Sequence, residues 1–158
     1  MNWQQVTEHP GLRDLPFKIE LNEYGAIIMN PVKLNHSVYQ SRINRTMGNM
    51  RPDGEASVEF AIWTPKGTKV ADVAWMSLAR WQTLKGKTEA DIAPEVCVEV
   101  LSMSNSDSEI KTKRNLYFAQ GAQEVWICDE DGQISFYNAR RKLRKSALFP
   151  DFPDHIEI

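Results

Sequence analysis

The stretch from residue 93 to residue 127 constrains the fold of this chain more than any other. An apolar run at 94–101 is followed by a polar turn, a helical pattern and a second apolar run. Ser106 and Glu109 are spaced as a capping box at the start of the helix, and Gly121 is typical of a helix end. This order predicts a strand, a helix and a further strand.

The flanking sequence predicts a single domain over residues 1–158. Alternating apolar residues at 17–22 and 26–29, joined by a turn, indicate a β-hairpin. It follows a polar segment at 1–16, which is expected to be an arm or a short irregular helix. Asn35 is placed to cap a helix that ends near Met50. Further strands are expected at 56–63, 69–76 and 133–137, with a short helix at 78–84 and one short strand in 146–158. This order favours an α/β or α+β domain, in which helices pack on a mixed sheet.

Composition excludes several classes of protein. The formal net charge is −2, so the overall charge of the chain does not indicate a nucleic-acid partner. No apolar run reaches the roughly 18–20 residues of a membrane span, and the N-terminal sequence lacks a signal-peptide pattern. The two cysteines fall in predicted interior strands, which suits a reduced, cytoplasmic protein. The basic run at 140–145 is interpreted as a solvated connector, with contacts to a phosphate backbone as the alternative.

Glu99 is the main chemical anomaly. The strand at 94–101 is apolar on both faces, which is typical of a central strand covered on both sides. An unpaired ionised carboxylate there would cost several kcal/mol, so Glu99 needs a partner, a proton or a metal ion. Asp72 poses the same question in the apolar strand at 69–76.

The phase of the following helix selects one lysine. Ile110, Lys113 and Tyr117 are spaced by three and four residues, so they share the face that turns towards the sheet. Lys111 lies about 200° away from Lys113 around the helix. We therefore expect Lys113 to lie over the end of the strand that carries Glu99.

Two carboxylates and a lysine suit a site for a hard cation. Mg²⁺, or Mn²⁺ in its place, binds one or two carboxylates together with waters and phosphate oxygens. A neighbouring lysine can orient or deprotonate water, or stabilise charge on a phosphate. The alternative is structural: Lys113 could pair with Glu99 or Glu109, and Asp72 could satisfy a turn. For any one of these residues alone, the structural interpretation is favoured. For the three residues together, a metal-dependent site is favoured.

Several segments resemble the Uma-type family of proposed restriction endonucleases, in the PD-(D/E)XK nuclease superfamily. They are KIELNEYGAIIMNP, NHSVYQSRI, VADVAWMS, PEVCVEVLS, SEIKTKRNLYFAQGAQEVWICD and ALFPDFPDHIEI, and they extend over residues 17–158. The resemblance implies a restriction-endonuclease-like mixed β-sheet flanked by helices. It also implies metal-dependent hydrolysis of phosphodiester bonds by an enzyme that acts on DNA.

The resemblance also implies roles for individual residues. Asp72 and Glu99 become ligands of the metal, with the backbone carbonyl of Val100 as a third. The superfamily's usual lysine, two residues after the glutamate, is replaced here by Leu101. In the Uma-type branch the lysine comes from the next helix, which makes Lys113 the catalytic lysine.

The chain departs from the family pattern at a few positions. Ala71 and Met103 stand where prolines are usual, and Glu109 stands where an aspartate is usual. The superfamily's first-helix acid has no clear match. His36, Gln40 and Glu20 are the candidates for its place, Glu109 is a further accessory candidate, and Lys111 and Arg114 are candidate phosphate contacts.

Two main hypotheses follow. The first is a Mg²⁺-dependent endonuclease that acts on DNA. The resemblance implies a homodimer, because many nucleases of this superfamily act as dimers with two sites. The second is a catalytically inactive module of the same fold that binds a nucleic acid or a protein partner. A metal-dependent phosphoesterase acting on a small substrate is a third hypothesis.

Overall fold

The computed structural model describes residues 1–158 and contains two separate sheets. The larger sheet has six strands in sequence order, and only β5 and β6 pair in parallel. The strands are β3 (Gly54–Ile62), β4 (Lys69–Ser77), β5 (Val96–Val100), β6 (Glu124–Cys128), β7 (Ile134–Tyr137) and β8 (Lys142–Leu143). The predicted mixed sheet is therefore confirmed.

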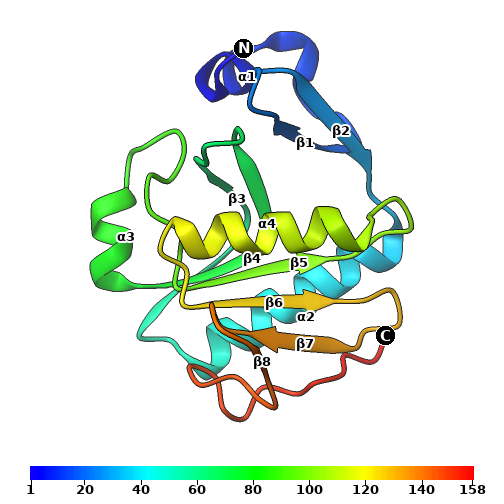
Figure 1. Cartoon of the computed structure of the whole chain (residues 1–158), viewed down its shortest axis with the longest axis vertical. Coiled ribbons are helices and arrows are strands. Elements are labelled where there is room, and N and C mark those ends of the chain that lie inside the picture. The colour runs from blue at the N-terminus through cyan, green and yellow to red at the C-terminus, as the bar shows by residue number, and fades with distance from the viewer.

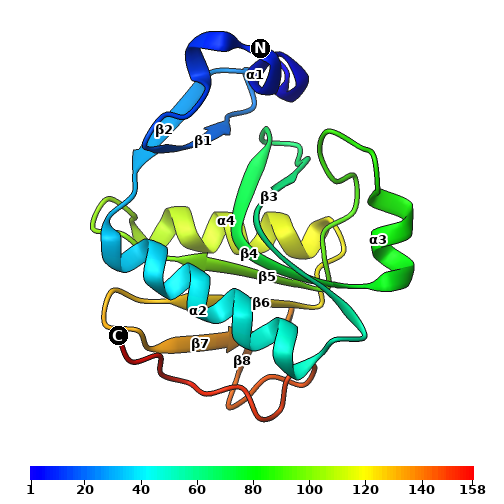
Figure 2. The same ribbon diagram turned by 180° about the vertical axis from the view of Figure 1, so that it is seen from behind.

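Two long helices cover opposite faces of this sheet. Helix α4 (Asp107–Ala119) lies in front of the strands in Figure 1, and α2 (Leu34–Met50) lies in front of them in Figure 2. Ile43 of α2 belongs to one buried cluster with Trp126, and Tyr117 of α4 belongs to a second cluster with Val125. Every residue of β5 and β6 is consequently buried, as both apolar runs predict. The short helix α3 (Leu78–Leu84) follows β4 directly.

The N-terminal part stands at one end of the larger sheet (Figure 1). It contains α1 (Trp3–Glu8), a 3₁₀ turn (Pro10–Leu12) and the hairpin of β1 (Phe17–Leu21) and β2 (Ile27–Pro31). The Leu21 amide donates to the Thr68 carbonyl at 2.9 Å, which docks β1 on the start of β4. Gly67 has φ +93°, and a Cβ there would lie 2.2 Å from the Leu21 carbonyl oxygen, so only glycine permits this close approach.

The central βαβ unit follows the prediction closely. The Glu109 amide donates to Ser106 Oγ at 3.2 Å at the start of α4, and Gly121 adopts φ +106° after its end. Apart from the C-terminal one, the expected strands and the helix at 78–84 differ from the observed bounds by two residues or fewer at each end. The basic side chains at 140–145 are exposed, as a solvated connector predicts, although Lys142 and Leu143 form the edge strand β8.

Two expectations about element ends were wrong. Helix α2 begins at Leu34 with Lys33 as its N-cap and without a capping side-chain hydrogen bond, so Asn35 lies inside the helix. The expected C-terminal strand is absent, because residues 146–158 contribute only an isolated bridge between Gln133 and His155. None of the helices combines the length and the apolar character that crossing a bilayer requires.

Candidate active site

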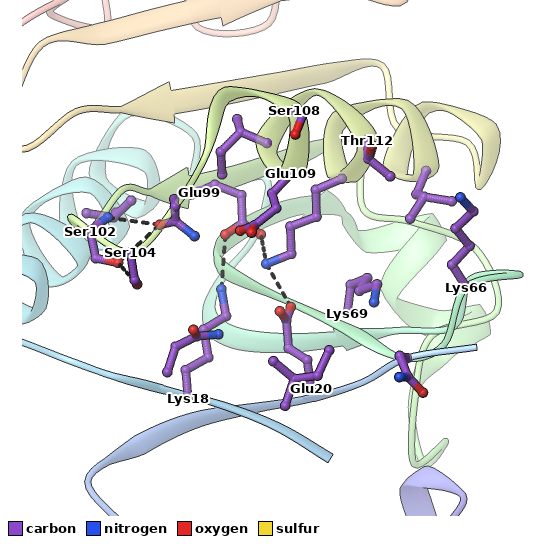
Figure 3. Close-up of a pocket in the computed structure, with 18 of the residues that line it drawn as sticks. Lys18, Glu20, Lys66, Lys69, Glu99, Ser102, Ser104, Ser108, Glu109 and Thr112 are labelled. Atoms are coloured by element: carbon purple, nitrogen blue, oxygen red, sulfur yellow. Dashed lines mark hydrogen bonds and ion pairs between the residues drawn. The ribbon is translucent and has the colours of Figure 1, made fainter. Parts of the chain in front are cut away.

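A cavity of about 450 Å³ opens between the N-terminal hairpin and the larger sheet, and we call it the hairpin pocket. It is lined by β1, the end of β5, the loop after β5 and one side of α4 (Figure 3). Its charged lining includes Lys18, Glu20, Glu99 and Lys113. Most of the other lining side chains are polar, so the pocket is suited to a polar ligand.

Asp72 is buried beside the pocket lining, at the point where the pairing of β4 with β5 stops. The ladder between these strands ends at Val73 and Val98. Beyond that pair, Asp72 Oδ2 accepts a hydrogen bond from the Val100 amide at 2.8 Å. Gln40 of α2 donates to the Asp72 carbonyl oxygen at 2.8 Å and so supports the backbone of this residue. Asp72 is only 2% exposed, and its side chain replaces the missing part of the ladder.

Glu99 lies on the floor of the pocket, one residue before the end of β5. Its Oε1 accepts a hydrogen bond from the Tyr117 hydroxyl at 2.6 Å and lies 3.3 Å from Lys113 Nζ. Lys113 and Tyr117 are one turn apart on α4, so the face predicted from helical spacing does meet Glu99. Tyr117 was not predicted as a site residue, although its four-residue spacing from Lys113 was the available signal.

The hairpin brings a third carboxylate. Lys18 and Glu20 are two residues apart on β1, so their side chains leave the same face of the strand. Glu20 Oε2 lies 2.8 Å from Lys113 Nζ and accepts a hydrogen bond from the Val70 amide at 2.6 Å. Glu20 therefore both docks the hairpin on β4 and contributes to the charged cluster.

Lys18 is a second residue of the cluster that the sequence does not predict. Its Nζ lies 3.1 Å from Asp72 Oδ1 and 3.0 Å from Glu99 Oε2, and its side chain is 12% exposed. The ammonium thus bridges the two carboxylates expected to bind metal, as Figure 3 shows for the contact with Glu99. The sequence signal was weak, because a lysine on an alternating hairpin strand is usually solvated.

Only some of the accessory residues expected from the sequence lie at the charged cluster or line the pocket. His36 Nε2 lies 3.5 Å from Asp72 Oδ2, and His36 Nδ1 is buried without a hydrogen-bond partner. Glu109 lines the pocket, whereas Lys111 and Arg114 do not. The guanidinium carbon of Arg114 lies 3.9 Å from the ring centre of Tyr137, so this side chain is already stacked on an aromatic face.

The cluster combines three buried carboxylates with two ammonium groups. Burial raises the pKa of Asp72, but the Lys18 ammonium and His36 outweigh it and hold that pKa well below its usual range. Burial also opposes ionisation of Glu20, yet Lys113 and Lys18 lower its pKa. Burial raises the pKa of Glu99, and the charges of Lys113 and Lys18 do not fully compensate. Glu99 is therefore the carboxylate whose charge the site balances least.

The Lys18 ammonium is stabilised by the same charges. Burial alone would lower its pKa, but the carboxylates of Glu99 and Asp72 raise it well above the ordinary lysine value. Lys18 is therefore a permanent cation in this arrangement at neutral pH.

The donor chemistry fits a hard divalent cation. Glu20, Asp72 and Glu99 offer only oxygen ligands, which Mg²⁺ and Mn²⁺ prefer. No group of three or more His, Cys, Asp or Glu side chains is arranged to hold an ion jointly. The carboxylates are joined through Lys18 and Lys113. The role of the Val100 backbone carbonyl as a third metal ligand stays a prediction.

Comparison with known proteins agrees with this architecture. A crystal structure from Anabaena variabilis, described as a "putative nuclease belonging to DUF820", superposes with a TM-score of 0.70. It is 19% identical, and the match covers 86% of this chain and 80% of that one, so the likeness shows a shared fold. No curated protein matches the chain at a significant level. The family profile of Uma2, described as "Putative restriction endonuclease", matches residues 3–154, and the chain therefore belongs to the Uma2 family.

Proposed function

We propose that this protein is a Mg²⁺-dependent endonuclease that hydrolyses phosphodiester bonds in DNA, with the hairpin pocket as its active site. One observation carries the proposal. Asp72, Glu99, Glu20 and Lys113, which come from β4, β5, β1 and α4, converge in one charged cluster beside an open polar pocket. Membership of a family described as restriction endonucleases supports a nuclease over other metal-dependent hydrolases.

The proposed ligands of the metal are Asp72 and Glu99, with Glu20 beside them. A bound Mg²⁺ supplies positive charge to phosphate oxygens and makes a coordinated water easier to deprotonate. Lys113 is proposed to hold the attacking water or to stabilise negative charge that develops on the phosphate. Tyr117 holds Glu99 Oε1 through its hydroxyl and so fixes the orientation of that carboxylate.

Asp72→Asn tests this proposal. The substitution keeps the shape of the side chain and an oxygen that can accept from the Val100 amide, but it removes the negative charge. We expect the wild-type protein to cleave plasmid DNA with Mg²⁺ and to stop in EDTA, and we expect cleavage by Asp72→Asn to fall by about 10²-fold or more. Gel analysis of cleavage over time provides the measurement.

Asp91→Asn is the matched control, because Asp91 is exposed and pairs only with Lys87. It should cleave at the wild-type rate. Undiminished cleavage by Asp72→Asn, with contaminating nuclease excluded, would remove Asp72 from the site. A panel of nucleotides assayed in parallel distinguishes a DNA endonuclease from a phosphoesterase that acts on small substrates.

The second candidate function is a binding module that retains the nuclease fold. It is favoured by the internal pairing of all three carboxylates with Lys18 and Lys113. This function predicts salt-dependent DNA binding that needs no Mg²⁺ and is unchanged in Glu99→Gln. The homodimer expected for the superfamily stays a prediction, which light scattering of the purified protein would test.

A further inference from the structure

We propose that Lys18 is a built-in counter-ion that occupies the space between Asp72 and Glu99, and that a divalent cation binds there only when the Lys18 ammonium leaves. This inference rests on the proposed function, because it concerns how the same site takes up its metal. The competing group is a side chain of this chain and needs no external regulator.

The Lys18 ammonium occupies the position that a metal ion bound by both Asp72 and Glu99 would take. Lys18 Nζ contacts one oxygen of each carboxylate, at 3.1 Å from Asp72 Oδ1 and 3.0 Å from Glu99 Oε2. A divalent cation bound by both carboxylates would lie within a few ångströms of that ammonium. The two cations would repel each other strongly in a buried site, so their binding is expected to be mutually exclusive.

The position of Lys18 is fixed by its strand. Strand β1 is held on β4 by the hydrogen bond from the Leu21 amide to Thr68 and by the bond from the Val70 amide to Glu20. The backbone of Lys18 is therefore anchored two residues from Glu20. Its ammonium sits at the end of a flexible four-carbon stem, beside a cavity of about 450 Å³. The ammonium can consequently move into the pocket while the hairpin stays docked.

Charge balance explains why such a counter-ion is useful. Three buried carboxylates without a cation would repel one another and destabilise the folded protein. Lys18 and Lys113 neutralise two of these charges in the absence of metal. The ion pairs of Lys18 also raise the concentration of metal needed to fill the site, because metal binding must release Lys18 from both of them.

Isothermal titration of Mg²⁺ and Mn²⁺ into the full-length protein tests the inference. Lys18→Met removes the competing charge and keeps an unbranched side chain, so we expect metal affinity to rise by about tenfold or more. Lys66→Met is the matched control, because Lys66 also lines the pocket but makes no ion pair with the three carboxylates. It removes the same charge from the pocket and should change the affinity by less than about threefold.

The possible outcomes separate this inference from the proposed function. Tighter binding in Lys18→Met alone supports both. Equal affinity in wild type and Lys18→Met overturns the role of Lys18 and leaves a metal-dependent nuclease standing. A similar gain in Lys66→Met and Lys18→Met also overturns it, because general pocket charge then explains the effect. Absence of metal binding in every variant overturns both.

A spectroscopic measurement on the wild-type protein covers the case in which Lys18→Met does not fold. The ammonium of Lys18 should give a protected ¹⁵N–¹H NMR signal in metal-free protein, which the charge-preserving variant Lys18→Arg identifies by its disappearance. Saturation with Mg²⁺ should shift or abolish this signal as the ion pairs break. An unchanged Lys18 signal in Mg²⁺-saturated protein would falsify the displacement.

Discussion

Lys113→Met is expected to lower the rate of Mg²⁺-dependent DNA cleavage by about 10²–10⁴-fold, the range typical of losing a group that positions or activates a proton donor or acceptor. Lys113 Nζ lies 2.8 Å from Glu20 Oε2 and 3.3 Å from Glu99 Oε1, and its side chain is 14% exposed towards the pocket. The methionine keeps the length of the stem while removing the cation. The rate should be measured under single-turnover conditions, so that product release does not mask the chemical step.

Lys111→Met is the control for this experiment. Lys111 lies on the same helix and carries the same charge, but it is exposed and does not line the hairpin pocket. Its variant should cleave within about twofold of wild type, because an exposed charge at this distance is screened by salt. Circular dichroism must show that Lys113→Met is folded at the assay temperature. A folded Lys113→Met that cleaves within about threefold of wild type would exclude Lys113 from the chemistry.

Glu124→Ala is expected to lower the free energy of unfolding by about 3–5 kcal/mol, because it leaves several buried donors without an acceptor. Glu124 is 2% exposed and lies at the start of β6. Its carboxylate accepts hydrogen bonds from four donors: Trp126 Nε1 at 2.8 Å, Ser146 Oγ at 2.6 Å, and the amides of Ala147 and Leu148 at 2.9 and 3.0 Å. These bonds tie the C-terminal segment to the sheet.

Urea denaturation followed by circular dichroism measures this loss. Glu55→Ala provides the reference, because Glu55 is an exposed strand residue on β3 and its variant should stay within about 0.5 kcal/mol of wild type. A loss below about 1 kcal/mol in Glu124→Ala would show that the C-terminal segment is held mainly by its apolar contacts.

The spacing of side chains within single strands and helices predicted much of the fold and the placement of two site residues, Glu99 and Lys113. The alternation of β5 placed Glu99 in a covered central strand, and the phase of α4 selected Lys113 over Lys111. Both inferences depend only on side chains within one element, where spacing fixes direction. The prediction of the βαβ unit was confirmed for the same reason, because Ser106 and Gly121 mark the helix ends by local backbone chemistry.

Long-range docking explains what could not be predicted. Lys18 reaches Asp72 and Glu99 because the hairpin folds over the end of the sheet, and no spacing within β1 reports that contact. The bond from the Val100 amide to Asp72 likewise depends on where the ladder between β4 and β5 stops. The start of the C-terminal segment likewise depends on Glu124, far away in sequence, which accepts hydrogen bonds from the amides of Ala147 and Leu148.

Anomalous scattering from Mn²⁺ in crystals of the full-length protein tests most directly whether the hairpin pocket is a metal-dependent active site. We expect a peak within about 2.5 Å of carboxylate oxygens from both Asp72 and Glu99, with Lys18 Nζ moved away from them. The contradicting result is a protein that cleaves DNA with Mn²⁺ while its Mn²⁺ lies at another site and Lys18 still bridges Asp72 and Glu99.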